Sequence, residues 1–234
     1  MLEVIACTPE EAAAAERGGA DRIEWIADPQ VGGVTPDLSA AAEMRRAVQL
    51  PIRVMVRPRG GGFVYGEDER EAMRRDIRRI LAAGGLDVVT GALTPEGTVD
   101  ESALAGLLNA GPGLAFTFHR AFDEAENLPH ALEVLSAYPQ VTDVLTSGGA
   151  PSAPEGAAAL AELLRRSGSS ADGPRILAGA GLTALNLRPF LEASGATRVH
   201  VGSAARVGGE ASAPIDPDRI REIRDIMRRH GSRR

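Results

Sequence analysis

The stretch TFHRAFD, Thr117–Asp123, places a histidine, an arginine and an acid directly after an apolar run. In LAFTFHR bulky residues alternate with small ones, and His119 falls on the face of the small residues. In a barrel of parallel strands the bulky face covers the helices and the other face fills the barrel. The alternation therefore predicts that His119 points into the barrel mouth, where an imidazole beside a carboxylate can act as general acid or base.

Other apolar runs also carry charged residues on their inward face. Glu3 lies in LEVIAC, Glu24 in RIEWI, and Arg53 and Arg57 in PIRVMVR. Burying an ion costs several kcal/mol unless it is paired, so these residues and His119 are expected to form a connected network. A structural ion-pair cluster in place of an apolar core is one interpretation. We favour a functional pocket, because charges at several strand ends converge on one place.

Glycine-rich turns follow several of the same runs and predict a site for an anion. RPRGGGFVY combines arginines with glycines that let a ligand approach the backbone, and LTSGG, AGAGL and HVGSA end later runs. Loops after the seventh and eighth strands of such barrels commonly hold phosphate, although plain turn geometry also explains glycines there. The predicted anion-binding residues are Arg59, Gly60, Gly61, Thr90, Thr146, Ser147, Gly179, Gly181, Gly202 and Ser203.

Nucleophilic and metal chemistry have weaker support in the sequence. Cys7 is the only cysteine, so a disulfide within the chain or a site of several thiolates is excluded. All 26 basic residues are arginine, which excludes a lysine Schiff base, and Ser147 lacks a Gly-x-Ser-x-Gly elbow. A metal site from Cys7, His119 and His200, with Met55, would draw on separate strands with no local ligand spacing. The sequence itself requires no cofactor.

Elements that would position these residues follow one repeated pattern. Eight short apolar runs alternate with segments of helical period, from LEVIAC at residues 2–7 to RVHVGS at 198–203. Thr8-Pro9 and Asp216-Pro217 are helix starts, and Gly18-Gly19 and Gly84-Gly85 are helix ends. This predicts a single (β/α)8 TIM barrel over residues 1–234, with 206–234 as a C-terminal helix and basic tail. A doubly wound sheet is the alternative, but ACTPEEA lacks its Gly-x-Gly-x-x-Gly turn.

Composition limits the partners. A net charge of −6 provides no basic face for nucleic acid, and the Arg-rich end RIREIRDIMRRHGSRR fits a solvated helix face. No apolar run is long enough to span a bilayer, so a soluble, cytoplasmic protein is expected, with a homodimer possible through apolar patches on its helices.

Motifs along most of the chain resemble those of the CutC family of copper homeostasis proteins. GADRIEW, IRVMVRPRGGGFVY, FTFHRAFD, VLTSGGAPSA, ILAGAGL and VHVGSA occur in the family's order between about Leu2 and Ala205. The resemblance implies a cytoplasmic, often oligomeric TIM barrel linked to copper tolerance, with copper as the possible bound ion. It also implies a cluster at the barrel mouth, formed by Glu3, Glu24, Arg57, His119, Arg120 and Asp123.

Two functions therefore compete. One is a CutC-like protein of copper homeostasis that binds copper. The other is a metal-independent lyase or isomerase that uses His119 and the carboxylates on a small phosphorylated or carboxylated metabolite. We predict a copper-homeostasis protein whose pocket accepts a small anionic molecule or a copper ion.

Overall fold

The structure is a computed structural model that describes residues 1–168 and 173–231. Within these residues eight strands alternate with eight α-helices. The strands are β1 (Leu2–Ala6), β2 (Arg22–Trp25), β3 (Ile52–Met55), β4 (Asp87–Thr90), β5 (Phe116–Phe118), β6 (Val141–Thr146), β7 (Arg175–Ala178) and β8 (Val199–Val201).

The helices follow the strands in order. They are α1 (Pro9–Gly18), α2 (Ala41–Ala47), α3 (Glu67–Ala83), α4 (Glu101–Ala110), α5 (Leu128–Ser136), α6 (Ala157–Ser167), α7 (Ala184–Ser194) and α8 (Pro217–Gly231). Short 3-10 helices lie at Pro29–Val31, Leu38–Ala40, Arg120–Glu124, Ser203–Ala205 and Val207–Gly209.

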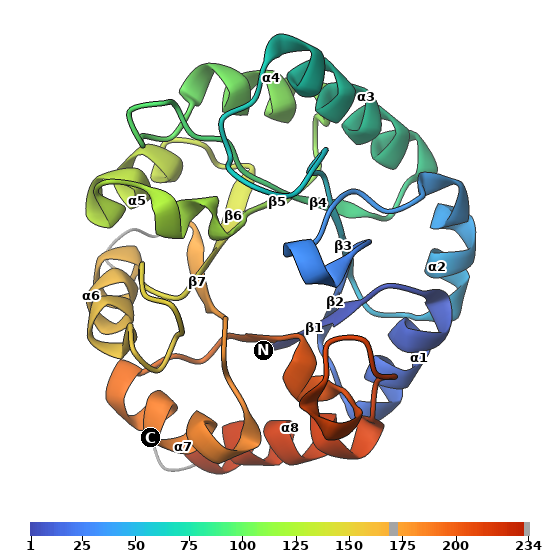
Figure 1. The fold of residues 1–234 in the computed structure, drawn as a ribbon, viewed down its shortest axis with the longest axis vertical. Coiled ribbons are helices and arrows are strands. Elements are labelled where there is room, and N and C mark those ends of the chain that lie inside the picture. The colour runs from blue at the N-terminus through green and yellow to red at the C-terminus, as the bar shows by residue number, and fades with distance from the viewer. Residues whose placement is uncertain (169–172, 232–234) are drawn as a thin grey trace.

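All strands pair in parallel with their sequence neighbours, and β1 pairs with β8 through Leu2 and Val199 to close the barrel. Figure 1 shows the ring of strands enclosed by the ring of helices. The predicted (β/α)8 barrel is confirmed, and each of the eight apolar runs contains a strand.

Helix boundaries fall at the signals in the sequence. The side chain of Thr8 accepts a hydrogen bond from the backbone of Glu11 and caps α1, which ends before Gly19 at a φ of 95°. α3 is followed by Gly84 at a φ of 69°, and α8 begins at Pro217. Left-handed backbone of this kind favours glycine because glycine has no Cβ to clash.

Each strand has one apolar and one polar face, as the alternation predicts. Val4, Ile23, Val54 and Phe116 are fully buried beneath the helices. Glu3 and other polar residues project into the barrel. This arrangement places charged side chains where many barrels of this fold carry branched apolar layers.

A charged layer fills the lower part of the barrel and is centred on Asp143 of β6. The Asp143 carboxylate lies 3.1 Å from a guanidinium nitrogen of Arg22, 3.0 Å from one of Arg53 and 2.6 Å from one of Arg198. Arg22 also donates to Glu3. The predicted network therefore exists around Glu3 and Arg53. Asp143, the central acid of this network, was not among the residues predicted from the sequence.

The C-terminal region differs from the prediction that residues 206–234 form a helix and a basic tail. Residues 206–216 precede α8 and contain a loop from which Arg206 and Ala211 reach the barrel mouth. Arg206 is buried and donates to the Glu11 carboxylate at 2.7 Å. Residues 232–234 of the predicted basic tail lie outside the described residues. No helix of the described chain combines the length and apolar character that a membrane crossing requires.

Candidate functional site

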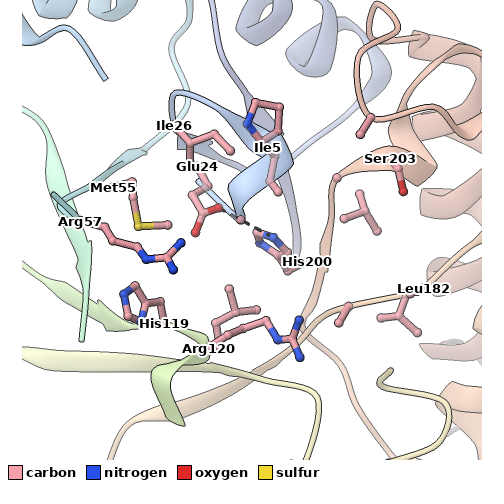
Figure 2. Close-up of a pocket in the computed structure, with 18 of the residues that line it drawn as sticks. Ile5, Glu24, Ile26, Met55, Arg57, His119, Arg120, Leu182, His200 and Ser203 are labelled. Carbon is pink, nitrogen blue, oxygen red and sulfur yellow. Dashed lines mark ion pairs between the residues drawn. The ribbon is translucent and has the colours of Figure 1, made fainter. Parts of the chain in front are cut away.

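A pocket of about 440 Å³ opens at the carboxyl ends of the strands. Its polar lining comes from several strands and the segments that follow them: Glu24, Arg57, His119, Arg120, His200, Ser203 and Arg206. Figure 2 labels all of these except Arg206. Met55 and Phe63 are among the apolar residues of its wall. The strands thus bring most of the predicted catalytic residues to one cavity, as their positions at strand ends require.

A row of three side chains runs from the pocket into the barrel: Glu24 and His200 line the pocket, and Glu3 lies beyond its lining. His200 Nδ1 lies 2.8 Å from a Glu3 oxygen, and His200 Nε2 lies 3.8 Å from a Glu24 oxygen (the dashed line in Figure 2). All three side chains are buried. The His200 imidazole therefore lies between the carboxylate of Glu3, which also pairs with Arg22, and that of Glu24, which does not.

The two carboxylates titrate in opposite directions. Burial would raise the pKa of Glu3, but the guanidinium of Arg22 and the imidazole of His200 outweigh it and lower that pKa to about 2. Burial raises the pKa of Glu24 to about 7, because His200 compensates only in part. Burial lowers the pKa of His200, but Glu24 and Glu3 outweigh it and raise that pKa overall. Glu24 is therefore the carboxyl that exchanges a proton near neutral pH.

His119 follows β5 and is held as a neutral imidazole. Burial, followed by the positive charge of Arg57, lowers its pKa to about 3. The backbone N–H of Ala121 donates to His119 Nδ1 at 3.1 Å, which assigns the proton of the neutral ring to Nε2. His119 is therefore a hydrogen-bond donor through Nε2, and its ring contacts Phe63 at a centroid distance of 4.9 Å.

Arg57 lines the same pocket without a carboxylate partner. Its guanidinium donates to the carbonyl oxygens of Val31, Gly33 and Gly61, at 2.9, 3.0 and 2.6 Å, and lies over the Phe63 ring. No ion pair among the described residues includes Arg57, although its exposed fraction is only 5%. The network predicted from the sequence therefore does not extend to Arg57 or His119.

Asp123 fixes a loop and does not line the pocket. Its carboxylate accepts hydrogen bonds from the Thr146 hydroxyl, from the backbone and hydroxyl of Ser147 and from the Gly149 backbone. Arg120 donates to Asp123 at 2.8 Å and reaches the pocket rim. The predicted catalytic role of Asp123 thus has no geometric support, and Thr146 and Ser147 serve to hold it.

Three of the predicted anion-binding residues line the pocket: Gly181, Gly202 and Ser203. Three of the others have roles that the sequence did not indicate. Arg59 is exposed and pairs with Glu69 at 2.6 Å, and the Thr90 hydroxyl donates to the Val56 carbonyl. A Cβ on Gly179 would lie 2.7 Å from Leu145 and 3.2 Å from His200, so this glycine makes room for both side chains.

Gly60 and Gly61 belong to the loop that encloses Arg57. The Gly61 carbonyl accepts a hydrogen bond from Arg57, and a Cβ on Gly60 would lie 2.9 Å from Val31. Neither glycine is part of the pocket lining. The glycine run therefore lets the loop approach the segment after β2.

Of the metal ligands named from the sequence, His119, His200 and Met55 line the pocket and Cys7 does not. The Cys7 sulfur lies 3.9 Å from an Arg206 nitrogen. Burial, and then Glu11, raise the pKa of its thiol. Among the described residues, the group with the spacing to hold an ion is Glu3, Glu24 and His200, whose ligand atoms lie within 4.8 Å of one another.

A closed (β/α)8 barrel with a polar pocket at the carboxyl ends of its strands belongs to the TIM-barrel class, whose enzymes place their chemistry at that end. Residues 1–205 match the model of the CutC family, and the chain belongs to this family.

Known proteins of the family agree with this assignment. The family protein CutC of Salmonella typhimurium is 42% identical over 200 residues, which are 86% of this chain and 78% of that protein. A crystal structure of the Streptococcus agalactiae protein named as a copper homeostasis protein, CutC, superposes with a TM-score of 0.79 at 27% identity and covers 86% of this chain and 97% of that one.

More distant barrels show the fold alone. Phosphoribosyl anthranilate isomerase from Thermococcus kodakaraensis superposes with a TM-score of 0.62 at 17% identity, covering 97% of this chain and 98% of that one.

Proposed function

We propose that the pocket at the barrel mouth binds a small anionic metabolite and transfers a proton on it, as a lyase or isomerase does. The observation that carries this proposal is Arg57, a buried guanidinium that faces the pocket without a carboxylate partner. A buried charge costs several kcal/mol unless an opposite charge compensates it. A carboxylate or phosphate group of a ligand would supply that charge.

Glu24 and His119 support proton transfer as the reaction. The pKa of Glu24, about 7, lets its carboxyl both take and return a proton at physiological pH. His119 contributes a neutral N–H donor that can stabilise negative charge developing on a ligand oxygen. Both side chains line the pocket that Arg57 lines.

The test of anion binding compares two arginines of one loop. Arg57→Gln removes the unpaired charge, whereas Arg59→Gln removes an exposed arginine outside the pocket. Calorimetric titration with inorganic phosphate and with oxalate should show affinity at least ~10-fold weaker for Arg57→Gln and unchanged for Arg59→Gln. Equal affinity in both variants, with circular dichroism of folded protein, would contradict the proposal.

We also propose that the protein serves copper homeostasis, the role named for its Streptococcus agalactiae relative. Direct copper binding has less support from the donor atoms. Cuprous ion prefers sulfur ligands, whereas Met55 supplies the only sulfur of the pocket lining. Cys7 packs against the cluster of Ile26, Met55 and Val89 but does not line the pocket. The Glu3, Glu24 and His200 group offers nitrogen and oxygen, which suit cupric ion, but Glu3 and one His200 nitrogen already hold partners.

A competition titration against a calibrated cuprous chelator tests copper binding. The untagged protein, Cys7→Ser and His119→Ala should all compete no better than the chelator's background. Stoichiometric copper binding that either substitution removes would instead establish a copper site. The small-molecule pocket would then be secondary to metal binding.

The setting of this activity is part of the proposal. We propose a cytoplasmic protein. We also propose that it forms a homodimer through apolar side chains exposed on its helices, such as Leu185 of α7, which is 94% exposed, and Leu81 of α3, which is 36% exposed. Size-exclusion chromatography with light scattering should give twice the monomer mass, and a monomer mass would refute the dimer.

A further inference from the structure

Three polar atoms of pocket residues lack a hydrogen-bond partner among the described residues. They are Oε1 of Glu24, Nε of Arg57 and Nε2 of His119. Each residue is buried by more than nine tenths, and each lines the same pocket. Buried polar atoms in folded proteins are nearly always paired, so three orphans around one cavity indicate that a ligand completes them.

Other unpaired atoms of the barrel have a different setting. Arg22, Arg53 and Arg198 each leave one nitrogen unpaired, but other nitrogens of the same guanidinium groups contact Asp143. The lower layer is thus neutralised within the protein. Arg57 and His119, at the mouth of the barrel, have no acid that neutralises them as Asp143 neutralises the arginines of the lower layer.

The three orphan atoms differ in what they can accept or give. His119 accepts from Ala121 through Nδ1, so its Nε2 presents a proton. Arg57 Nε is a second donor, and the unpaired hydroxyl of Tyr65 interacts with the same guanidinium. Glu24 Oε1 is an acceptor, and its other oxygen faces His200 at 3.8 Å. Figure 2 shows the Arg57 guanidinium between Glu24 and His119 in projection, and Arg57 and His119 both contact the Phe63 ring.

The two donors, on Arg57 and His119, can hydrogen-bond to a carbonyl oxygen of a ligand. The acceptor, Glu24 Oε1, can take a proton from the carbon next to that carbonyl. We propose that the substrate is a small anionic carbonyl compound and that the reaction is enolisation, with Glu24 Oε1 as the base and His119 Nε2–H as the donor to the enolate oxygen. This inference rests on the proposed function and names the substrate class of that site.

The proposed step balances without an oxidant or a co-reactant. Glu24 takes the proton from the carbon next to the carbonyl, and the C–H electron pair forms a carbon–carbon double bond. The carbonyl π pair moves onto oxygen, where the N–H of His119 and the charge of Arg57 stabilise it. Return of the proton from Glu24 to carbon regenerates the carbonyl compound or its epimer.

Carbon-bound hydrogen exchange measures enolisation directly. Proton NMR in D₂O would follow dihydroxyacetone phosphate, pyruvate and 2-oxoglutarate with the wild-type chain, Glu24→Gln and His119→Phe. Glu101→Gln and His130→Phe are matched controls, because both residues are exposed outside the pocket. We expect catalysed exchange of at least one probe, reduced at least ~100-fold in each pocket variant and unchanged in the controls.

The outcomes separate this inference from the proposed function. Absence of catalysed exchange across the three probes overturns enolisation, and so does exchange that either pocket variant retains while folded. Phosphate or oxalate binding that depends on Arg57 would still uphold an anion pocket in that case. The opposite result is that Arg57→Gln binds phosphate and oxalate as tightly as the wild type, while hydrogen exchange occurs and depends on Glu24. That result would overturn the assignment of Arg57 as the anion-binding residue.

Discussion

Replacing Glu24 by glutamine should make the protein less sensitive to rising pH. The folded state raises the pKa of this carboxyl from 4.5 to about 7, so it holds the proton more tightly than the unfolded chain does. The stability that follows is complete below pH 4.5 and is lost as the pH rises through 7. At ~1.4 kcal/mol for each pH unit of that interval, the loss amounts to about 3 kcal/mol.

His200 acts in the same direction, since its pKa is also raised when folded. Its contribution is present below the unfolded pKa of 6.5 and is lost as pH rises through the folded value. Glu24→Gln removes the contribution of this carboxyl to the pH dependence of the unfolding free energy. It also weakens the contribution of His200, because Glu24 helps to raise the His200 pKa. Between pH 5 and pH 8 the wild-type chain should therefore lose about 2–3 kcal/mol more unfolding free energy than the variant.

Urea unfolding followed by the fluorescence of Trp25, the only tryptophan, measures both proteins at each pH. Glu101→Gln is the control, because that exposed glutamate lies outside the barrel and should leave the pH dependence of the wild type. Parallel curves for Glu24→Gln and the wild type would refute the assignment of a proton to Glu24 near neutral pH.

Three further substitutions test the packing that supports the site. Asp143→Asn should lower the unfolding free energy by about 3–5 kcal/mol, because it leaves several buried guanidinium groups without their acid; a loss below ~1 kcal/mol in urea titrations would contradict this. Gly91→Ala places a Cβ 2.7 Å from His119 Nδ1 and should weaken oxalate binding in calorimetry, whereas unchanged affinity would show that the ring can move freely. Gly156→Ala brings a Cβ to 1.9 Å from a backbone oxygen and should lower the melting temperature strongly, whereas Gly62→Ala meets nothing within 4 Å and should leave it near the wild-type value.

Strand alternation explains why the barrel and part of its site follow from sequence. The period of two assigns Glu3, Glu24 and Arg53 to the interior, and the structure buries all three there. Position at a strand end likewise brings His119 and Arg57 to the mouth. These properties depend on local geometry, which the order of residues along the chain determines.

Partner choice could not be predicted in the same way. Asp123 and Arg57 both stand near the mouth, but one binds a neighbouring turn and the other binds loop carbonyls. Alternation along a strand predicts which face of the sheet a side chain lies on. It does not predict where the end of a long side chain reaches or which partner it binds. The one signal for Asp143 in the sequence is an acid inside the apolar run TDVLTS.

Asp143 also constrains the order in which the chain can become stable. Its arginine partners are Arg22 of β2, Arg53 of β3, Arg175 of β7 and Arg198, which directly precedes β8. Arg22 and Arg53 belong to the first half of the chain and the other two to the second. A nascent chain that has emerged only through β4 holds Arg53 without Asp143, whereas Arg22 retains Glu3. Separate half-barrel fragments should therefore fold poorly alone and recover structure when mixed, since assembly of the ring brings Asp143 to Arg22 and Arg53.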